Sequence, residues 1–217
     1  MLKLGTGSIS DIGTVLCIGA HSDDIEIGCG GTILKLLDAN PGIAVEWVVL
    51  SAEGDREEEA RSSAERFLSA ASESSIRIEA FRERYFPYVG DEVKEYFDGL
   101  ASQVAPDLVF SHRLEDRHQD HRITAELVEN TFRDHLILQY EIPKYDGDLA
   151  TPNVYVELEP EILDRKIQYL VEEFRTQAGR YWFTEDTFRS MARIRGIESR
   201  AKSGFAEGFH CRKLVML

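Results

Sequence analysis

The sequence predicts an α/β protein with a mainly parallel central sheet and helices on both faces of that sheet. Stretches typical of strands and of amphipathic helices alternate at least four times along the 217 residues, which is the pattern of parallel α/β folds. The first apolar stretch, residues 14–20, lacks polar alternation, as strands buried on both faces do. Hydrophobic residues make up 43% of the chain, enough for a substantial core, and the length fits one domain over residues 1–217.

The individual elements are expected from local patterns. In the helix after the first strand, Ile33, Leu34 and Leu37 lie on one side, and Pro106 precedes a later strand. Up to residue 142 the expected order is strand 14–20, helix 30–40, strand 43–54, helix 55–71, strand 76–81, helix 90–104, strand 106–112, helix 121–132 and strand 136–142. The last third adds strand 152–158, helices 159–177 and 185–204, and a closing strand 209–217, in the same domain because no linker precedes them.

Composition narrows the function classes. The net charge of −14 argues against a nucleic-acid partner, because phosphate binding needs clustered Lys and Arg. The three cysteines, Cys17, Cys29 and Cys211, form no CxxC pair, which favours the reducing cytoplasm over a disulfide-stabilised compartment. We expect no membrane association, because no stretch approaches the roughly 20 apolar residues of a membrane helix and the N-terminus lacks the apolar run of a signal peptide.

Two short motifs that combine His and Asp follow predicted strands. The first, HSDD at 21–24, places His21 and Asp24 three residues apart, so that both can face one point. The second, HQDH at 118–121, places His118 and His121 likewise, with Asp120 between them. Ligands of parallel sheets bind beyond the carboxyl ends of the strands, and two imidazoles with one carboxylate are a usual set for a catalytic zinc that keeps one position open for water. Both motifs could instead be helix caps, since Asp is common there; two caps that are both rich in His favour metal.

At these residues the chain resembles the PIG-L/LmbE-like deacetylase family. The resemblance is carried by AHSDD at 20–24, by HQDH at 118–121 and by the glycine-rich GCGGT turn between them, and it extends over nearly the whole chain. It implies a Rossmann-like three-layer fold and zinc-dependent removal of an acetyl group from an N-acetylglucosamine-type amino sugar. It also suggests a homo-oligomer.

Carried over by position, the resemblance gives each motif residue a role. The implied Zn²⁺ ligands are His21, Asp24 and His121. Asp23 would be the general base that activates water, and His118 would stabilise the oxyanion or protonate the leaving amine. Asp120 would orient His118.

Ser22 departs from the family, which usually has proline at this position. Proline fixes its φ near −65° and stiffens the turn. Serine leaves the functional side chains in place and permits a looser loop, so we expect Ser22→Pro to keep both zinc and activity.

Other residues near the expected site are weaker candidates. His112 and Asp116 could contact substrate or order their loop, and Tyr140 and Glu141 end a strand at the ligand-binding edge. Arg56 and Arg61 could hold a sugar hydroxyl or a phosphate, and the aromatic residues Tyr85, Phe86, Tyr88, Trp182 and Phe183 could line an acceptor site. Structural roles are favoured for these residues, with Arg61 as a helix partner of Glu65 and the aromatic residues as core, and Cys29 is expected to be small filler. The glycines at 28, 30 and 31 form no GxGxxG pattern, so a dinucleotide site is disfavoured.

The preferred hypothesis is a zinc amidase that deacetylates a small amino-sugar substrate. One alternative is an amidase that removes another acyl group from an amino-sugar conjugate or antibiotic precursor. The other is a sugar-binding module without catalysis, against which Asp23 argues, because binding alone needs no base.

Overall fold

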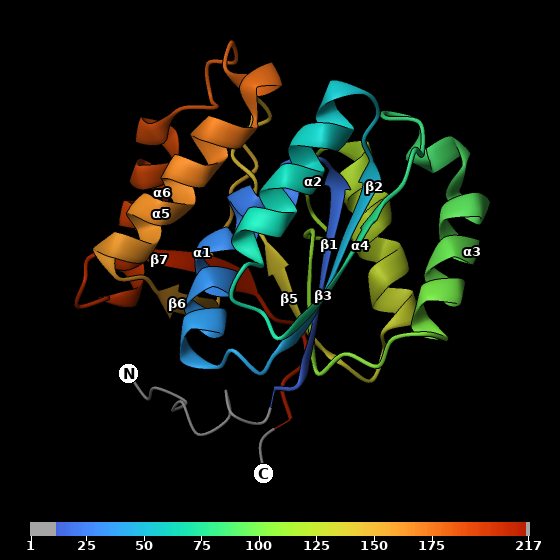
Figure 1. Ribbon diagram of the computed structural model, residues 1–217, viewed down its shortest axis with the longest axis horizontal. Coiled ribbons are helices and arrows are strands. Elements are labelled where there is room, and N and C mark those ends of the chain that lie inside the picture. Colours follow the sequence, from blue (N-terminus) through green and yellow to red (C-terminus); the bar gives the residue numbers. More distant parts are fainter. Residues whose placement is uncertain (1–11, 216–217) are drawn as a thin grey trace.

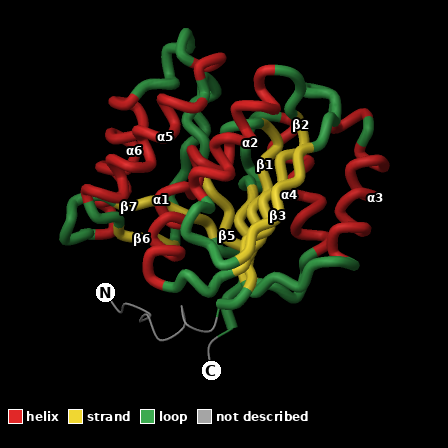
Figure 2. Tube along the Cα trace, in the orientation of Figure 1, coloured by secondary structure: helices red, strands yellow, loops and turns green. Residues whose placement is uncertain are grey.

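The computed structural model describes residues 12–215, and within them seven strands form one sheet with the order β3-β2-β1-β4-β5-β7-β6 (Figures 1 and 2). The first five strands in the chain run parallel, whereas β7 is antiparallel to both of its neighbours, β5 and β6. The strands are β1 (Thr14–His21), β2 (Ala44–Ser51), β3 (Glu73–Ile78), β4 (Leu108–Ser111), β5 (Leu136–Tyr140), β6 (Val154–Glu157) and β7 (Ala206–His210).

The helices form one layer on each face of the sheet. Residues of α1, α2, α5 and α6 share one hydrophobic cluster with one side of the strands, and residues of α3 and α4 share a second cluster with the other side. The helices are α1 (Asp24–Ala39), α2 (Asp55–Phe67), α3 (Gly90–Ala101), α4 (Gln119–Thr131), α5 (Pro160–Glu173) and α6 (Glu185–Ser199), with short 3₁₀ turns η2 (Phe86–Tyr88) and η3 (Arg175–Gln177). The predicted fold class is therefore confirmed.

Strand β1 shows why its sequence lacks polar alternation. Val15 and Cys17 face the cluster that includes α1, while Leu16 and Ile18 face the cluster that includes α3 and α4. Both sides of the strand are buried because a parallel sheet with helices on both faces exposes neither of them.

Helix α1 begins at Asp24, six residues before the predicted start at residue 30, and this corrects the expectation of a glycine-rich turn. The glycines at 28, 30 and 31 lie inside the helix, where a side chain has no room. A Cβ at Gly28 would lie 2.2 Å from the ring of Tyr140 on β5. Glycine here lets α1 approach the sheet closely.

Other boundaries differ by a few residues. Helix α4 begins at Gln119, two residues before the predicted start, because His118 caps it. Strand β3 starts at Glu73 and ends at Ile78, ahead of the predicted 76–81. The predicted closing strand 209–217 is shorter and earlier, since β7 ends at His210; residues 216–217 of that prediction lie outside the described residues.

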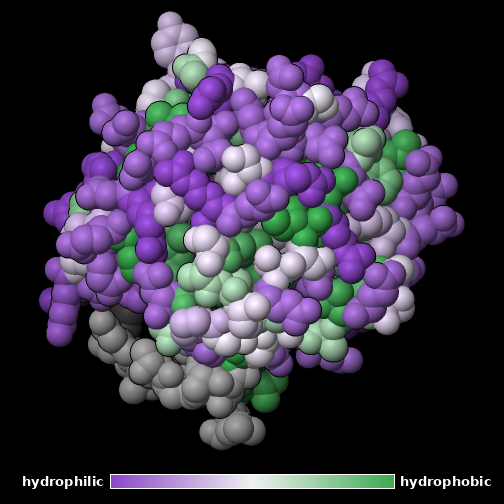
Figure 3. Space-filling view, in the orientation of Figure 1, coloured by the Kyte–Doolittle hydropathy of each residue, from purple (hydrophilic) through white to green (hydrophobic). Residues whose placement is uncertain are grey.

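The face of the molecule seen in Figure 3 is mostly hydrophilic, with hydrophobic residues confined to small areas. Residues 12–215 contain no helix with the length and apolar character needed to cross a membrane.

A buried ion pair joins one helix layer to the sheet at β7. Lys166 of α5 donates to Glu207 of β7 at 2.6 Å and to the carbonyl of Ile27 at 2.7 Å. Glu207 also accepts hydrogen bonds from the backbone of Gly31 and Thr32 in α1. Both charged side chains are less than 10% exposed.

We expect Lys166→Met to lower the free energy of unfolding by about 3–5 kcal/mol, because it leaves the Glu207 carboxylate buried without its cation. Urea denaturation measures the change. The matched control is Arg165→Met on the same helix, whose half-exposed pair with Asp38 is worth about 0–1 kcal/mol. Equal losses in the two variants would contradict this account.

Candidate metal centre

The two His/Asp motifs meet at the carboxyl edge of the sheet, at the top of Figure 1. His21 is the last residue of β1, and Asp24 begins α1 on one face; His121 lies in the first turn of α4 on the other face. Strands β1 and β4 are neighbours, yet the helices that follow them cover opposite faces. Such a switch in direction leaves a crevice in which α/β proteins bind ligands.

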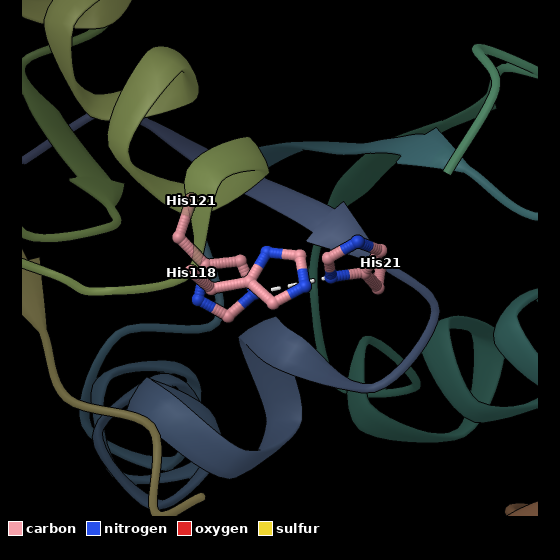
Figure 4. Close-up of side chains that lie close together, drawn as sticks. All are labelled: His21, His118 and His121. Atoms are coloured by element: carbon pink, nitrogen blue, oxygen red, sulfur yellow. Dashed lines mark hydrogen bonds between the residues drawn. The ribbon is translucent and has the colours of Figure 1, made fainter. Parts of the chain in front are cut away.

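His21, Asp24 and His121 form a closed triangle of contacts. His21 Nδ1 lies 3.1 Å from His121 Nε2 and 3.4 Å from Asp24 Oδ2. His121 Nε2 lies 3.5 Å from Asp24 Oδ1. Figure 4 shows the imidazole of His21 reaching from β1 toward those of His118 and His121 at the start of α4. All three members of the triangle are at most 7% exposed.

A second carboxylate contacts the outer nitrogen of each imidazole in the triangle. His21 Nε2 lies 3.3 Å from Asp120 Oδ2, and His121 Nδ1 lies 3.1 Å from Asp116 Oδ2. Carboxylates in this position fix the tautomer and the ring orientation of metal-binding histidines. His21 Nδ1 and His121 Nε2 are thus the nitrogens that face inward.

The Asp120 carboxylate therefore does not orient His118 as expected. It contacts His21 and accepts hydrogen bonds from the backbone N–H groups of Arg84 and Phe86. The link to His118 runs the other way: the Asp120 backbone N–H donates to His118 Nδ1 at 3.3 Å. The reason is local, because His118 is the N-cap of α4 and its ring accepts the exposed N–H of the first turn.

Protonation differs between neighbouring groups. Burial alone would lower the pKa of His21, but hydrogen bonds with Asp120 and Asp24 raise it to about 10. Burial and nearby His112 lower the pKa of His121 to about 3. Of the two rings, His21 thus favours the protonated form more strongly than His121 does.

Asp23 is the N-cap of α1, yet its side chain makes no capping hydrogen bond. Its Oδ2 is buried and has no hydrogen-bond partner, while the residue lines a cleft. Burial, followed by repulsion from Asp24, raises the pKa of Asp23 to about 6. The helix-cap alternative therefore does not account for this carboxylate.

His112 lies behind the triangle and is fully buried. Its Nε2 is 3.1 Å from Asp24 Oδ2, 3.0 Å from the backbone nitrogen of Ala20 and 3.3 Å from the Tyr140 hydroxyl. That hydroxyl donates to the carbonyl of Ile18 in β1. These contacts give His112 and Tyr140 an ordering role, as Asp116 has beside His121.

More than one set of donors could hold an ion. Besides the triangle, the potential ligand atoms of His21, His118 and His121 lie within 4.8 Å of one another, and so do those of Asp24, His112 and His121. His121 belongs to every set, which makes it the most informative residue to change.

A cleft that is partly open to solvent lies over the triangle. Among the residues that line this cleft, the sequence analysis identified the motif residues and Arg56. It missed several others, because they come from distant loops and form no motif. The missed lining residues are Glu83, Arg84, Ile142, Lys144, Tyr145, Asp146, Gln177 and Arg180.

The weaker candidates divide between the cleft and the rest of the molecule. Trp182 lines the cleft, although we expected core. Phe86 and Phe183 are core, as expected, whereas Tyr85 and Tyr88 are exposed, which corrects the expectation for these two residues. Arg61 pairs with Glu57, not with Glu65, at the surface, and Glu141 is held by a buried ion pair with Arg195. Cys29 is a core residue.

Ser22 holds an arginine at the edge of the cleft. Arg56 donates to Ser22 Oγ from Nε at 3.2 Å and from Nη2 at 3.1 Å, and its Nη1 pairs with Glu83 at 2.8 Å. Ser22 is fully buried. Its hydroxyl therefore has a partner that proline could not provide.

Comparison with known families agrees with this geometry. Residues 16–132, more than half of the chain, match the PIG-L family, described as GlcNAc-PI de-N-acetylase. The chain belongs to the PIG-L family. The matched range contains both His/Asp motifs and ends at Phe132, just after α4.

Proteins that resemble this PIG-L protein do not all have the same named activity. It is 26% identical to the uncharacterized deacetylase YaiS of Escherichia coli K12 over 161 residues, 69% of this chain and 80% of YaiS. The N,N'-diacetylchitobiose deacetylase of Pyrococcus horikoshii superposes with a TM-score of 0.67 at 21% identity, over 96% of this chain and 87% of that one. The 4-carboxy-2-hydroxymuconate hydratase GalB of Pseudomonas putida KT2440 gives 0.70 at 18% identity, over 95% and 98%. Fold alone thus leaves the reaction open.

We expect Ser22→Ala and Arg56→Met to be coupled by about 1 kcal/mol in a double-mutant cycle of unfolding free energies, because they share two hydrogen bonds to a charged group. Ser22→Pro should show the same coupling as Ser22→Ala. As a control, Ser62→Ala removes a hydroxyl that binds Glu173 and should be additive with Arg56→Met. An additive Ser22 cycle would mean that the contacts with Arg56 contribute nothing. That Ser22→Pro keeps activity stays a prediction.

Proposed function

We propose that this PIG-L protein is a zinc-dependent hydrolase that removes the acetyl group from an N-acetylglucosamine-type amino sugar or its conjugate. The observation that carries the proposal is the triangle of His21, Asp24 and His121, in which each imidazole turns one nitrogen inward and the other toward a carboxylate. A buried cluster of this kind is expected where a metal ion is held.

The donor atoms fit zinc. Ligands at zinc-bond lengths of 2.0–2.2 Å in a tetrahedron are about 3.3–3.6 Å apart. The three contacts of the triangle, which involve both carboxylate oxygens of Asp24, measure 3.1, 3.4 and 3.5 Å. Two imidazoles and one carboxylate match a catalytic site, which has three protein ligands and keeps a fourth position for water or substrate. We therefore assign His21, Asp24 and His121 as the ligands.

Asp23 is assigned as the general base. Its Oδ2 is buried without a partner, and the residue lines the cleft beside the triangle, so the carboxylate can accept a proton from a water molecule there. When bound, zinc acts as a Lewis acid that makes a water acidic near neutral pH and polarises the amide carbonyl. Asp23 then holds the proton taken from the water.

His118 is assigned as the group that stabilises the oxyanion or protonates the leaving amine. Its Nδ1 accepts the Asp120 N–H, so the neutral ring carries its proton on Nε2. The residue lines the cleft, where the Nε2–H of the neutral ring can donate a hydrogen bond to an oxyanion, whereas protonation of the leaving amine would require the imidazolium form. Asp120 contributes through its backbone to His118 and through its carboxylate to His21.

The overall test is hydrolysis of a simple substrate. The purified chain with one equivalent of Zn²⁺ should release acetate and a primary amine from the methyl glycoside of N-acetylglucosamine. Zinc binding with no acetate from this glycoside, but with release of the acid from an analogue that carries a longer N-acyl chain, would favour the alternative amidase. Sugar binding without any hydrolysis would favour a binding module.

We expect Asp23→Asn to bind zinc as the wild type does but to lower kcat by about 10²–10⁴, because general-base catalysis is lost while the ligands remain. Elemental analysis and acetate release measure the two properties separately. Unchanged turnover would remove the assignment of Asp23 as the base.

His121→Ala should lose zinc, because His121 belongs to every candidate set of donors. His118→Ala should keep zinc and lose most turnover, while His135→Ala, outside the cleft, should change neither. Loss of zinc from the His118 variant would show that the ion is held by the three histidines instead.

A further inference from the structure

Lys144 lines the cleft, but its ammonium group is occupied by other groups of the protein. The Nζ atom lies 2.9 Å from Asp116 Oδ2 and 2.8 Å from Asp148 Oδ2, and it donates to the carbonyl of Ile142 at 3.3 Å. The three charged side chains are each at most 10% exposed. Because an ammonium group has three donors, these contacts leave none of them for a substrate.

The Asp116 carboxylate connects Lys144 to the proposed metal centre. Its Oδ2, which pairs with Lys144, also lies 3.1 Å from His121 Nδ1, so one oxygen contacts both side chains. Its Oδ1 accepts a hydrogen bond from the backbone N–H of His118 at 2.8 Å. The position of this carboxylate therefore sets the orientation of the His121 ring. A change at Lys144 can reach the centre through Asp116, without a direct contact with a zinc ligand.

Asp148 connects Lys144 to a loop at the rim of the cleft. We call residues 142–148, in the connection between β5 and β6, the cleft loop. Asp148 Oδ2 accepts a second hydrogen bond from the backbone N–H of Arg117 at 2.8 Å, and the Arg113 side chain donates to the Asp148 carbonyl. Both arginines lie in the connection between β4 and α4. The cleft loop is therefore attached to the segment that leads into the second His/Asp motif.

Ion pairs, more than apolar packing, hold the outer part of the cleft loop. Tyr145 is 70% exposed, and Leu149, which follows the loop, is 46% exposed, so burial of their side chains contributes little. Gly147 has a φ of 61°, a left-handed conformation that suits glycine, and the chain turns there between Lys144 and Asp148. The pairing of Lys144 with Asp148 closes this turn. The loop would thus lose its main attachment if the ammonium group were removed.

We propose that Lys144 is a positioning residue that couples zinc binding at His121 to docking of the cleft loop, an inference that rests on the ligands assigned under the proposed function. Coupling between two sites is reciprocal. If the docked loop favours the zinc-binding orientation of His121, then bound zinc favours the docked loop by the same factor. Tyr145 and Asp146 of the loop line the cleft, so loading of the centre also fixes this part of the cleft wall.

The first measurement is the Kd for Zn²⁺, obtained by competition with a chromophoric chelator. Lys144→Met should raise this Kd about tenfold or more, as expected when a partner behind a metal-binding histidine is disturbed. Lys144→Arg retains the positive charge and should restore part of the affinity. Asp148→Asn removes the ion pair of the loop but leaves an amide oxygen for the Arg117 N–H, so it should raise the Kd by less. This variant also keeps the test decisive if Lys144→Met does not fold.

The second measurement is hydrogen exchange of backbone amides, followed by mass spectrometry with and without zinc. In the wild type, zinc should slow exchange in residues 142–148 by about the same factor of ten, because the coupling is reciprocal. Residues 200–204, which follow α6 outside the cleft lining, should exchange equally in both states. In Lys144→Met saturated with zinc, the loop should exchange as fast as in the metal-free variant. A purely structural lysine would change exchange without removing the effect of zinc.

Lys166→Met is the matched control, because it removes an ammonium group from another buried ion pair, that with Glu207, outside the cleft lining. It should leave both the zinc Kd and the effect of zinc on loop exchange as in the wild type.

A folded Lys144→Met variant with the wild-type zinc Kd would overturn the coupling, and so would wild-type loop exchange that does not respond to zinc. If Lys144→Met does not fold, a wild-type Kd in Asp148→Asn has the same meaning. Neither measurement needs hydrolysis, so coupling without acetate release would reject the proposed function alone. Acetate release without coupling would reject this inference alone. A wild type that binds no zinc would overturn the assigned ligands and the coupling together.

Discussion

Ionisable side chains are buried side by side at the carboxyl edge of the sheet, so each must find its hydrogen-bond or ion-pair partners among the others. His21, Asp24 and His121 contact one another, and Asp116 and Asp120 occupy the outer nitrogens of the two imidazoles. Buried ion pairs are weak sources of net stability, because desolvation offsets much of their attraction. Apolar residues could fill the same space at least as well. The cluster is therefore better explained by a ligand than by folding.

Packing contacts around β1 position this cluster of side chains. Gly28 lets α1 lie against the ring of Tyr140, whose hydroxyl donates to the β1 backbone at Ile18. The same hydroxyl contacts His112, which in turn contacts Asp24 at the start of α1. The position of the Asp24 carboxylate is thus tied to the sheet through buried contacts. A bulky residue at position 28 would move the helix that begins with Asp24.

Sequence reasoning could predict the fold and the members of the cluster, because both depend on local signals. Apolar runs and helical periodicity defined the layers, and two four-residue motifs at strand ends defined the residues that meet. It failed for Gly28, where a glycine that normally marks a turn serves close packing within a helix. It also failed for the Asp120 carboxylate, whose partners His21 and Arg84 come from segments 99 and 36 residues away. Pairings over such separations arise only when the sheet brings its strands together.

The residues proposed to carry out the reaction lie in short sequence motifs, whereas the residues at the rim of the cleft come from loops that are far apart in the sequence. The centre comes from two short segments, residues 21–24 and 116–121, and each carries a His/Asp motif that is visible in the sequence. The rim of the cleft comes from the loops around Arg84, Lys144 and Arg180, which belong to three different connections of the fold. Loops tolerate change more readily than the elements that they join. A deacetylase and a hydratase share this scaffold, so fold likeness is uninformative about the rim. The charges of this chain's own loops are the better guide to what enters the cleft.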